Sequence, residues 1–269
     1  MNRRVLPLMM GLLLFPLGCI TDPFASQLLQ PSELCSDYPD DARPTFEDRT
    51  IGNMVYVMAW PEVDNTHPLT CGIVSALEKS PFENPQHTAS ITSLVGLQNL
   101  TSLTRLALSH HLISDISPLS GLTSLTRLEL DENLISDISP LSGLRNLTRL
   151  ELKKNSITDI SALSGLTSLT WLDVGNNSIT DIRGVSGLTN LTELRMDENS
   201  ISDISALGGL TGLFRLNLDN NPDLTDIQPL LDNTELGSGQ VVFLRNTNVS
   251  CADVAALKSK GVGVWSDCP

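Results

Sequence analysis

The stretch that decides the fold is residues 125–190, three successive blocks that read LTRLELDENLISDISPLSGLRN, LTRLELKKNSITDISALSGLTS and LTWLDVGNNSITDIRGVSGLTN. Each block has 22 residues, and five blocks follow one another without insertion from Leu103 to Gly212, with a sixth opening at Leu213. Apolar residues, asparagine, aspartate and glycine keep the same places from block to block. A fixed period of this length predicts a stack of similar units, each packed only against its neighbours.

One block contains the signals of two kinds of secondary structure. In the second copy, Leu128 and Leu130 alternate with polar residues, which is the periodicity of a strand. Ile138, Leu141 and Leu144 follow at intervals of three, which suits a tight helical or 3₁₀ return. The leucine spacing is that of a leucine-rich repeat solenoid. The sequence therefore predicts an α/β fold with a parallel sheet on one side and short helical returns on the other.

Two polar positions accompany the leucines. The first predicts a buried amide column that satisfies backbone groups of adjacent coils; it contains Asn133, Asn155, Asn177, Asn199 and Asn221, with His111 and Thr247 at its ends. The second contains Asp115, Asp137, Asp159, Asp181, Asp203 and Asp226. These aspartates could form a calcium ladder, or each could accept backbone N–H bonds at its own turn. The second interpretation is favoured, because the coils lack the extra glycines and aspartates of calcium-binding repeats.

The helical returns carry a start signal. Ser117-Pro118 and Ser139-Pro140 predict an N-cap serine followed by proline at the first helical position. Arg183-Gly184 departs from this pattern, so the fourth coil is expected to return less regularly.

The N-terminus has the features of an export signal. Arg3 and Arg4 precede an apolar run, residues 5–17, that is too short to span a membrane. The run ends at Gly18-Cys19, which resembles a bacterial lipoprotein signal with Cys19 as the lipidated residue. A secretory signal cut near Ala25 is the alternative. We favour a chain that is lipid-anchored in the bacterial cell envelope, at the outer membrane or cell surface, and otherwise secreted.

The cysteines agree with export. Five cysteines are present, and assigning Cys19 to lipid leaves two on each flank of the repeats. The economical pairing is Cys35–Cys71 and Cys251–Cys268, one disulfide for each cap. Disulfides are favoured over metal binding, because no cysteine or histidine pair has ligand spacing. We predict no metal site and no cofactor.

The chain divides into five segments: a signal peptide at 1–19, a tether at 20–34, an N-terminal cap at 35–90, the repeats at 91–240 and a C-terminal capping coil at 241–269. In the N-terminal cap we expect a strand at 54–60 and a helix at 71–79. In the capping coil we expect strands at 242–244 and 262–265, a helix at 251–260, and Trp265 packed within the cap. These elements are expected to shield the open edge of the sheet, and the protein is expected to be a monomer.

Residues 91–240 resemble the internalin-type family of bacterial leucine-rich repeat proteins, through the motif Leu-x-x-Leu-x-Leu-x-x-Asn-x-Ile-x-Asp-Ile-x-x-Leu-x-Gly-Leu. The resemblance implies a right-handed solenoid that binds protein or glycan partners on its concave face. It covers a little over half of the chain. The immunoglobulin-like module and wall-anchoring motif of internalins are not found, so we do not expect a role in host-cell invasion.

Side chains between the leucines are expected on the concave face and are the candidate partner-binding residues. They are Arg105, Arg127, Glu129, Arg149, Glu151, Lys153, Trp171, Asp173, Glu193, Arg195 and Arg215. They could be a solvated salt-bridge lattice in which each pair contributes little. They could instead be a recognition surface with Trp171 as its aromatic anchor, since tryptophan and arginine are enriched among interface hot spots. Gly175 is expected to leave a gap beside Trp171 that admits a partner side chain.

Other function classes fit poorly. A net charge of −14 argues against nucleic acid. Only four histidines are present, without a nucleophile elbow, zinc motif or phosphate loop, so we expect no enzyme. The sequence predicts a non-enzymatic protein-binding lipoprotein of the cell envelope. The alternatives are a passive spacer at the cell surface and an accessory subunit of an envelope enzyme.

Overall fold

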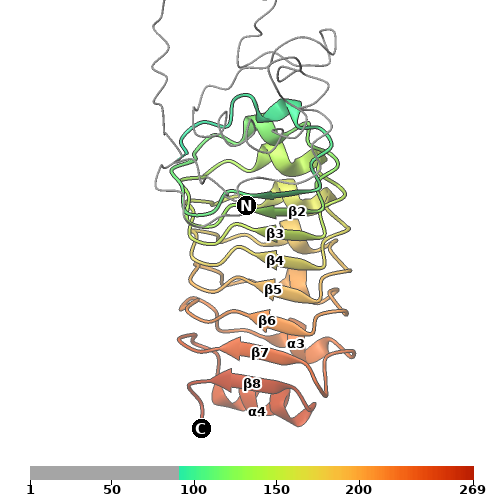
Figure 1. Cartoon of the computed structure of the whole chain (residues 1–269). Coiled ribbons are helices and arrows are strands. Elements are labelled where there is room, and N and C mark those ends of the chain that lie inside the picture. The colour runs from blue at the N-terminus through green and yellow to red at the C-terminus, as the bar shows by residue number, and fades with distance from the viewer. Residues whose placement is uncertain (1–90) are drawn as a thin grey trace, which may run out of the picture.

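In the computed structural model, which describes residues 91–269, each block forms one coil of a stack (Figure 1). Eight strands form one parallel sheet in the order of the chain, from β1 to β8. The repeats supply β1 (Arg105–Ala107), β2 (Arg127–Glu129), β3 (Arg149–Glu151), β4 (Trp171–Asp173), β5 (Glu193–Arg195) and β6 (Arg215–Asn217). The predicted leucine-rich repeat solenoid with a parallel sheet is therefore confirmed.

Strand pairing is in register, because the period is constant. Leu106 lies opposite Leu128, and Leu150 lies opposite Leu172. In every repeat strand the middle leucine is buried and the residue on each side of it points outward, apart from the buried Asp173. One face of the sheet therefore lines the core, and the other, which we call the sheet face, carries the variable residues.

The returns are short 3₁₀ helices, as the sequence predicts. They are η4 (Leu97–Asn99), η5 (Ser117–Leu119), η6 (Ser139–Gly143), η7 (Ser161–Gly165), η8 (Arg183–Val185) and η9 (Ser205–Leu207), followed by the helix α3 (Gln228–Asp232). The fourth return is as regular as the others: Ile182, which precedes η8, has φ −109° and ψ 15°, against −111° and 16° for Ile160 before η7. The expected irregularity at Arg183-Gly184 was wrong.

The predicted serine caps were also wrong. Ser117 is the first residue of η5, and no side chain of the preceding Ile116 caps it. The acceptor is the aspartate two residues earlier: Asp115 Oδ1 accepts the Ser117 N–H at 2.8 Å. The same bond, at 2.7–2.9 Å, recurs in all six copies of the aspartate column. The interpretation of these aspartates as turn acceptors is thereby confirmed.

The asparagine column joins adjacent coils as predicted. Asn133 Nδ2 donates to the carbonyl oxygens of Leu108 and Leu130, at 2.8 and 3.0 Å, and its Oδ1 accepts the Ile113 N–H at 3.1 Å. At the start of the column, His111 Nδ1 accepts the Ile91 N–H at 3.4 Å. At the end, Thr247 Oγ1 donates to the Leu244 oxygen at 2.8 Å.

The core is one continuous aliphatic cluster of leucine, isoleucine, valine and a single methionine, Met196. None of the four aromatic residues between 91 and 269 belongs to it. In the fourth coil the backbones of neighbouring coils approach closely, since a Cβ added at Gly184 would lie 2.2 Å from the Ile160 oxygen. The glycine that breaks the sequence pattern is therefore required by this close approach.

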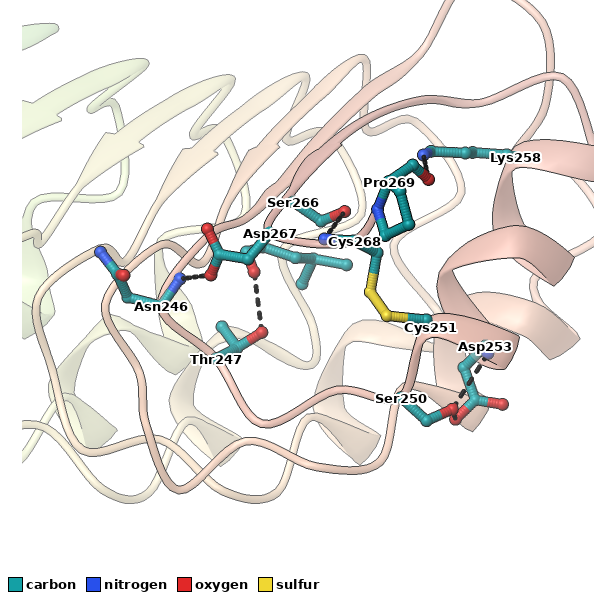
Figure 2. Close-up of a disulfide and its surroundings, with 11 residues drawn as sticks. Asn246, Thr247, Ser250, Cys251, Asp253, Lys258, Ser266, Asp267, Cys268 and Pro269 are labelled. Atoms are coloured by element: carbon teal, nitrogen blue, oxygen red, sulfur yellow. Dashed lines mark hydrogen bonds between the residues drawn. A yellow bond between two sulfur atoms is a disulfide. The ribbon is translucent and has the colours of Figure 1, made fainter.

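The C-terminal coil contains β7 (Val241–Leu244), α4 (Cys251–Ser259) and β8 (Gly263–Ser266), where the sequence predicts them. Figure 2 shows the Cys251–Cys268 disulfide, which confirms that predicted pair and ties the start of α4 to the residues after β8. Ser250 caps α4 by accepting the Asp253 N–H at 3.1 Å. Trp265 is 59% exposed, so its expected packing within the cap was wrong.

The signal peptide, the tether, the N-terminal cap, Cys19 and the Cys35–Cys71 pair lie outside the described residues. Within residues 91–269, no helix has the length and apolar character needed to cross a membrane.

Candidate partner-binding surface

The sheet face brings the predicted surface residues into two adjoining columns. The first column runs across the strands through Arg105, Arg127, Arg149, Trp171, Glu193 and Arg215. The second runs through Ala107, Glu129, Glu151, Asp173, Arg195 and Asn217. Lys153 lies two residues beyond Glu151, just after β3. The columns are continuous because every repeat strand has the same length and register.

Ion pairs link the two columns. Arg127 Nε lies 2.5 Å from Glu129 Oε1, and Arg149 Nε lies 2.6 Å from Glu151 Oε1. In β5 the order is reversed, and Arg195 Nη2 lies 2.6 Å from Glu193 Oε1. All these side chains are partly exposed, so each pair adds little to the free energy of folding. Their structural effect is to hold long side chains in fixed orientations.

Trp171 lies between two guanidinium groups. Arg149 Cζ is 3.6 Å from the centroid of the Trp171 ring, and Arg195 Cζ is 5.4 Å from it. Cation–π contacts of this kind contribute about 0.5–1 kcal/mol at exposed sites. Trp171 is half-buried, so the indole is a fixed feature of the surface with one part still open to solvent.

The expected gap beside Trp171 is not there. A Cβ at Gly175 would lie 3.0 Å from Asp197 Oδ1 and 3.1 Å from Asp173 Oδ1, so carboxylates already occupy the space. The Gly175 N–H donates to Asp173 Oδ1 at 2.9 Å. Gly175 thus lets two acidic side chains converge over the backbone, and the prediction of an entry point for a partner side chain was wrong.

The carboxylates at the centre of the sheet face have perturbed acidity. Burial raises the pKa of Asp131 to about 7, and the charges of Glu151 and Asp173 act in the same direction, while a hydrogen bond from the Lys153 N–H opposes them. Burial also raises the pKa of Asp173. Lys153 Nζ offsets part of this negative charge, at 3.4 Å from Asp197 Oδ2. In the part of the chain that the structure describes, no three ligand-type side chains are grouped to hold a metal ion.

The sequence missed an aromatic extension of the sheet face. Phe243 in β7 lies opposite Asn217, and Trp265 in β8 lies opposite Phe243, so both continue the second column. Their rings are stacked, with centroids 6.3 Å apart and planes 10° apart. Arg215 Cζ is 4.8 Å from the centroid of the Phe243 ring. The spacing from Arg215 to Val241 is 26 residues rather than 22, which hid this register; the alternation in Val241–Leu244 was the available signal.

The solenoid and its outward-facing columns define a leucine-rich repeat protein. Models of leucine-rich repeats match residues 123–179 and 167–209. The internalin inlF of Listeria monocytogenes is similar at 27% identity and a TM-score of 0.71, over 83% of this chain and 64% of that one. Internalin C2 of the same organism is similar at 30% identity and a TM-score of 0.57, over 84% of this chain and 100% of that one. The chain belongs to the internalin-type family of bacterial leucine-rich repeat proteins.

Other comparisons add less. The chain spans 64% of the length of the inlF structure. A plant peptide hormone receptor, RGFR1 in complex with RGF2, is similar at 25% identity and a TM-score of 0.52, over 64% of this chain and 30% of that one. No curated protein sequence matches the chain.

Proposed function

We propose that this protein is a non-enzymatic binding protein of the bacterial cell envelope that captures a protein partner on its sheet face. It is exported, and a lipid on Cys19 anchors it to the membrane. The candidate contact residues are the two columns on β1 to β6 together with Lys153. Trp171 is the central anchor.

The observation that carries this proposal is where the repeat stops repeating. The core positions, the asparagine column and the aspartate column are nearly constant from coil to coil, because they build the stack. The first column of the sheet face changes from arginine to tryptophan to glutamate and back to arginine. Three of the four aromatic residues between 91 and 269 also lie on this face. Stacking does not require that variation, whereas recognition of one partner does.

The membership in the internalin-type family and the likeness to a receptor solved with its peptide ligand support a binding role. A passive spacer remains the alternative, since the ion pairs satisfy most charges of the sheet face internally. One cation is different: Arg105 has no carboxylate partner among residues 91–269, because its neighbour in the second column is Ala107. An unpaired guanidinium in an otherwise paired lattice favours recognition over a spacer.

Capture by a double variant of the full chain tests the proposal. Trp171→Ala with Arg149→Glu removes the aromatic anchor and reverses the charge over it. We expect loss of the partners that the wild-type chain retains in a pull-down, with unfolding free energy lowered by only about 1 kcal/mol, the size of one exposed cation–π contact. Arg145→Glu, an exposed change off the sheet strands, is the matched control and should capture normally. Equal capture by all three proteins would reject the sheet face as the binding surface.

The lipid anchor has a separate test. A clickable fatty acid fed to expressing bacteria should label the wild-type chain and leave a Cys19→Ala chain unlabelled. An unlabelled wild-type chain would reject lipidation and favour the ordinary secretory signal.

A further inference from the structure

The last strand of the sheet has an open edge. Among residues 91–269, β8 pairs only with β7. The Gly263 N–H points toward β7, where it donates to the Gln240 oxygen at 2.9 Å, so the alternation of a strand directs the Val264 N–H outward. Edge strands are commonly protected from pairing by lysine, proline, a bulge or a covering segment. β8, with the sequence GVWS, has no charged residue and no proline.

The edge also carries the exposed tryptophan of the C-terminal coil. One face of the Trp265 ring stacks on Phe243 in β7. The other ring face is therefore directed away from β7, beyond the end of the sheet. Trp265 is 59% exposed, which makes it, with Phe214, the most exposed large apolar side chain of the described residues. A large aromatic surface at an unpaired edge is a typical feature of an association site.

Helix α4 leaves room beside the edge. Its buried residues are Val254 and Leu257. The face directed away from them is exposed and made of small side chains: Ala252, Ala255, Ala256 and Ser259. Paired strands lie about 4.8 Å apart, whereas packed helices lie about 8–10 Å apart. A small-residue face lets a second helix come near enough for the strand edges to meet.

Charge permits the same contact. The chain carries a net charge of −14, which opposes association of two copies in general. From Cys251 to Pro269, however, two lysines balance two aspartates, so this end of the solenoid has no net charge. The Cys251–Cys268 disulfide joins α4 to the segment after β8 (Figure 2), so the helix and the edge present one rigid surface.

We propose that two copies of this protein associate end to end, with β8 of one copy paired antiparallel to β8 of the other across a twofold axis. A second copy is the occupant because it brings a matching uncharged edge, a second Trp265 and a second small-residue helix face, which a lone peptide strand does not. This proposal replaces the monomer expected from the sequence: the segment expected to shield the edge forms the edge itself. It uses a different end of the molecule from the proposed partner-binding columns and does not rest on them.

The test is sedimentation velocity of the full chain over a concentration series, with Cys19→Ala in every sample so that lipid does not contribute. Four residues of strand make a small interface, so the dimer is weak and should appear only at roughly 0.1 mM or above. Ala255→Glu, a charge on the exposed helix face, and Trp265→Lys should remain monomeric throughout. Phe214→Lys, which removes an equally exposed aromatic residue away from β8, should dimerise like the wild type.

Hydrogen exchange supplies a second readout that identifies the interface. The Val264 amide should exchange more slowly at high concentration in the wild-type chain and show no such change in Ala255→Glu. A wild-type chain that stays monomeric across the series would overturn the proposal. So would a dimer that Ala255→Glu preserves, or one that forms without protection of Val264.

Discussion

The asparagine column allows a quantitative test of how the coils are held together. Asn199 is 6% exposed. Its Oδ1 accepts the Ile179 N–H at 2.9 Å, and its Nδ2 donates to the carbonyl oxygens of Val174 and Met196, both at 3.1 Å. The change to make is Asn199→Ala, which removes both functions of the amide while leaving the aliphatic core in place.

The size of the effect follows from which groups lose their partners. The two carbonyls keep a second donor, because Asn177 also donates to the Val174 oxygen and Asn221 to the Met196 oxygen, each at 3.0 Å. The Ile179 N–H is left buried without an acceptor. An orphaned buried donor costs about 1–3 kcal/mol, and each lost hydrogen bond adds about 0.5–1.5 kcal/mol. We therefore expect Asn199→Ala to lower the free energy of unfolding by about 2–4 kcal/mol.

A matched variant in the aspartate column separates burial from hydrogen bonding as the cause. Asp203 accepts the Ser205 N–H at 2.8 Å, but this turn is exposed and water can replace the carboxylate. Asp203→Ala should cost about 1 kcal/mol, the usual loss for a capping side chain. Equilibrium unfolding in urea measures both variants. Equal losses, or a loss below about 1 kcal/mol for Asn199→Ala, would refute the reasoning.

Two further predictions concern single positions. Gly184→Ala places a Cβ 2.2 Å from the Ile160 oxygen and must shift backbone, so it should lower the melting temperature, whereas Gly187→Ala, whose Cβ meets nothing closer than 3.7 Å, should raise stability by about 0.4–1 kcal/mol; loss of stability in both would contradict the close approach of the coils. The pKa of Asp131 is raised from 3.8 to about 7, so the stability contributed by its protonated form is lost as the pH rises between these values. Asp131→Asn should therefore gain on the wild type in thermal melts from pH 4 to 7.5, and a difference that stays constant with pH would be evidence against the raised pKa.

The sequence predicted the stack well because the period itself is the structural unit. Once one leucine is assigned to the core, a residue 22 positions away occupies the equivalent place in the next coil. The asparagine and aspartate columns were assigned correctly for that reason. The caps were not: Asp115 and Ser117 are both suitable capping residues two positions apart, and only the backbone geometry shows that Ser117 is inside the helix and Asp115 is its acceptor.

The surface was harder to predict, since it depends on contacts between coils rather than on position within one. Gly175 suggested a gap, but the residues that fill it come partly from the next coil, where Asp197 lies. Phe243 and Trp265 joined the sheet face across a spacing that differs from the repeat, so no period marked them. Their stacking is a property of register, which the sequence fixes only where the block length is constant.

The same lattice that argued for a passive surface has a consequence for binding. Ordering a long side chain at an interface costs about 0.5–1.5 kcal/mol. Arg149 and Arg195 already have fixed positions, each held by a carboxylate of its own strand and by the Trp171 ring. A partner that docks over Trp171 therefore meets side chains whose ordering cost was met on folding. Ion pairs that add little to stability make this face rigid, and rigidity is the property that lets a small patch bind selectively.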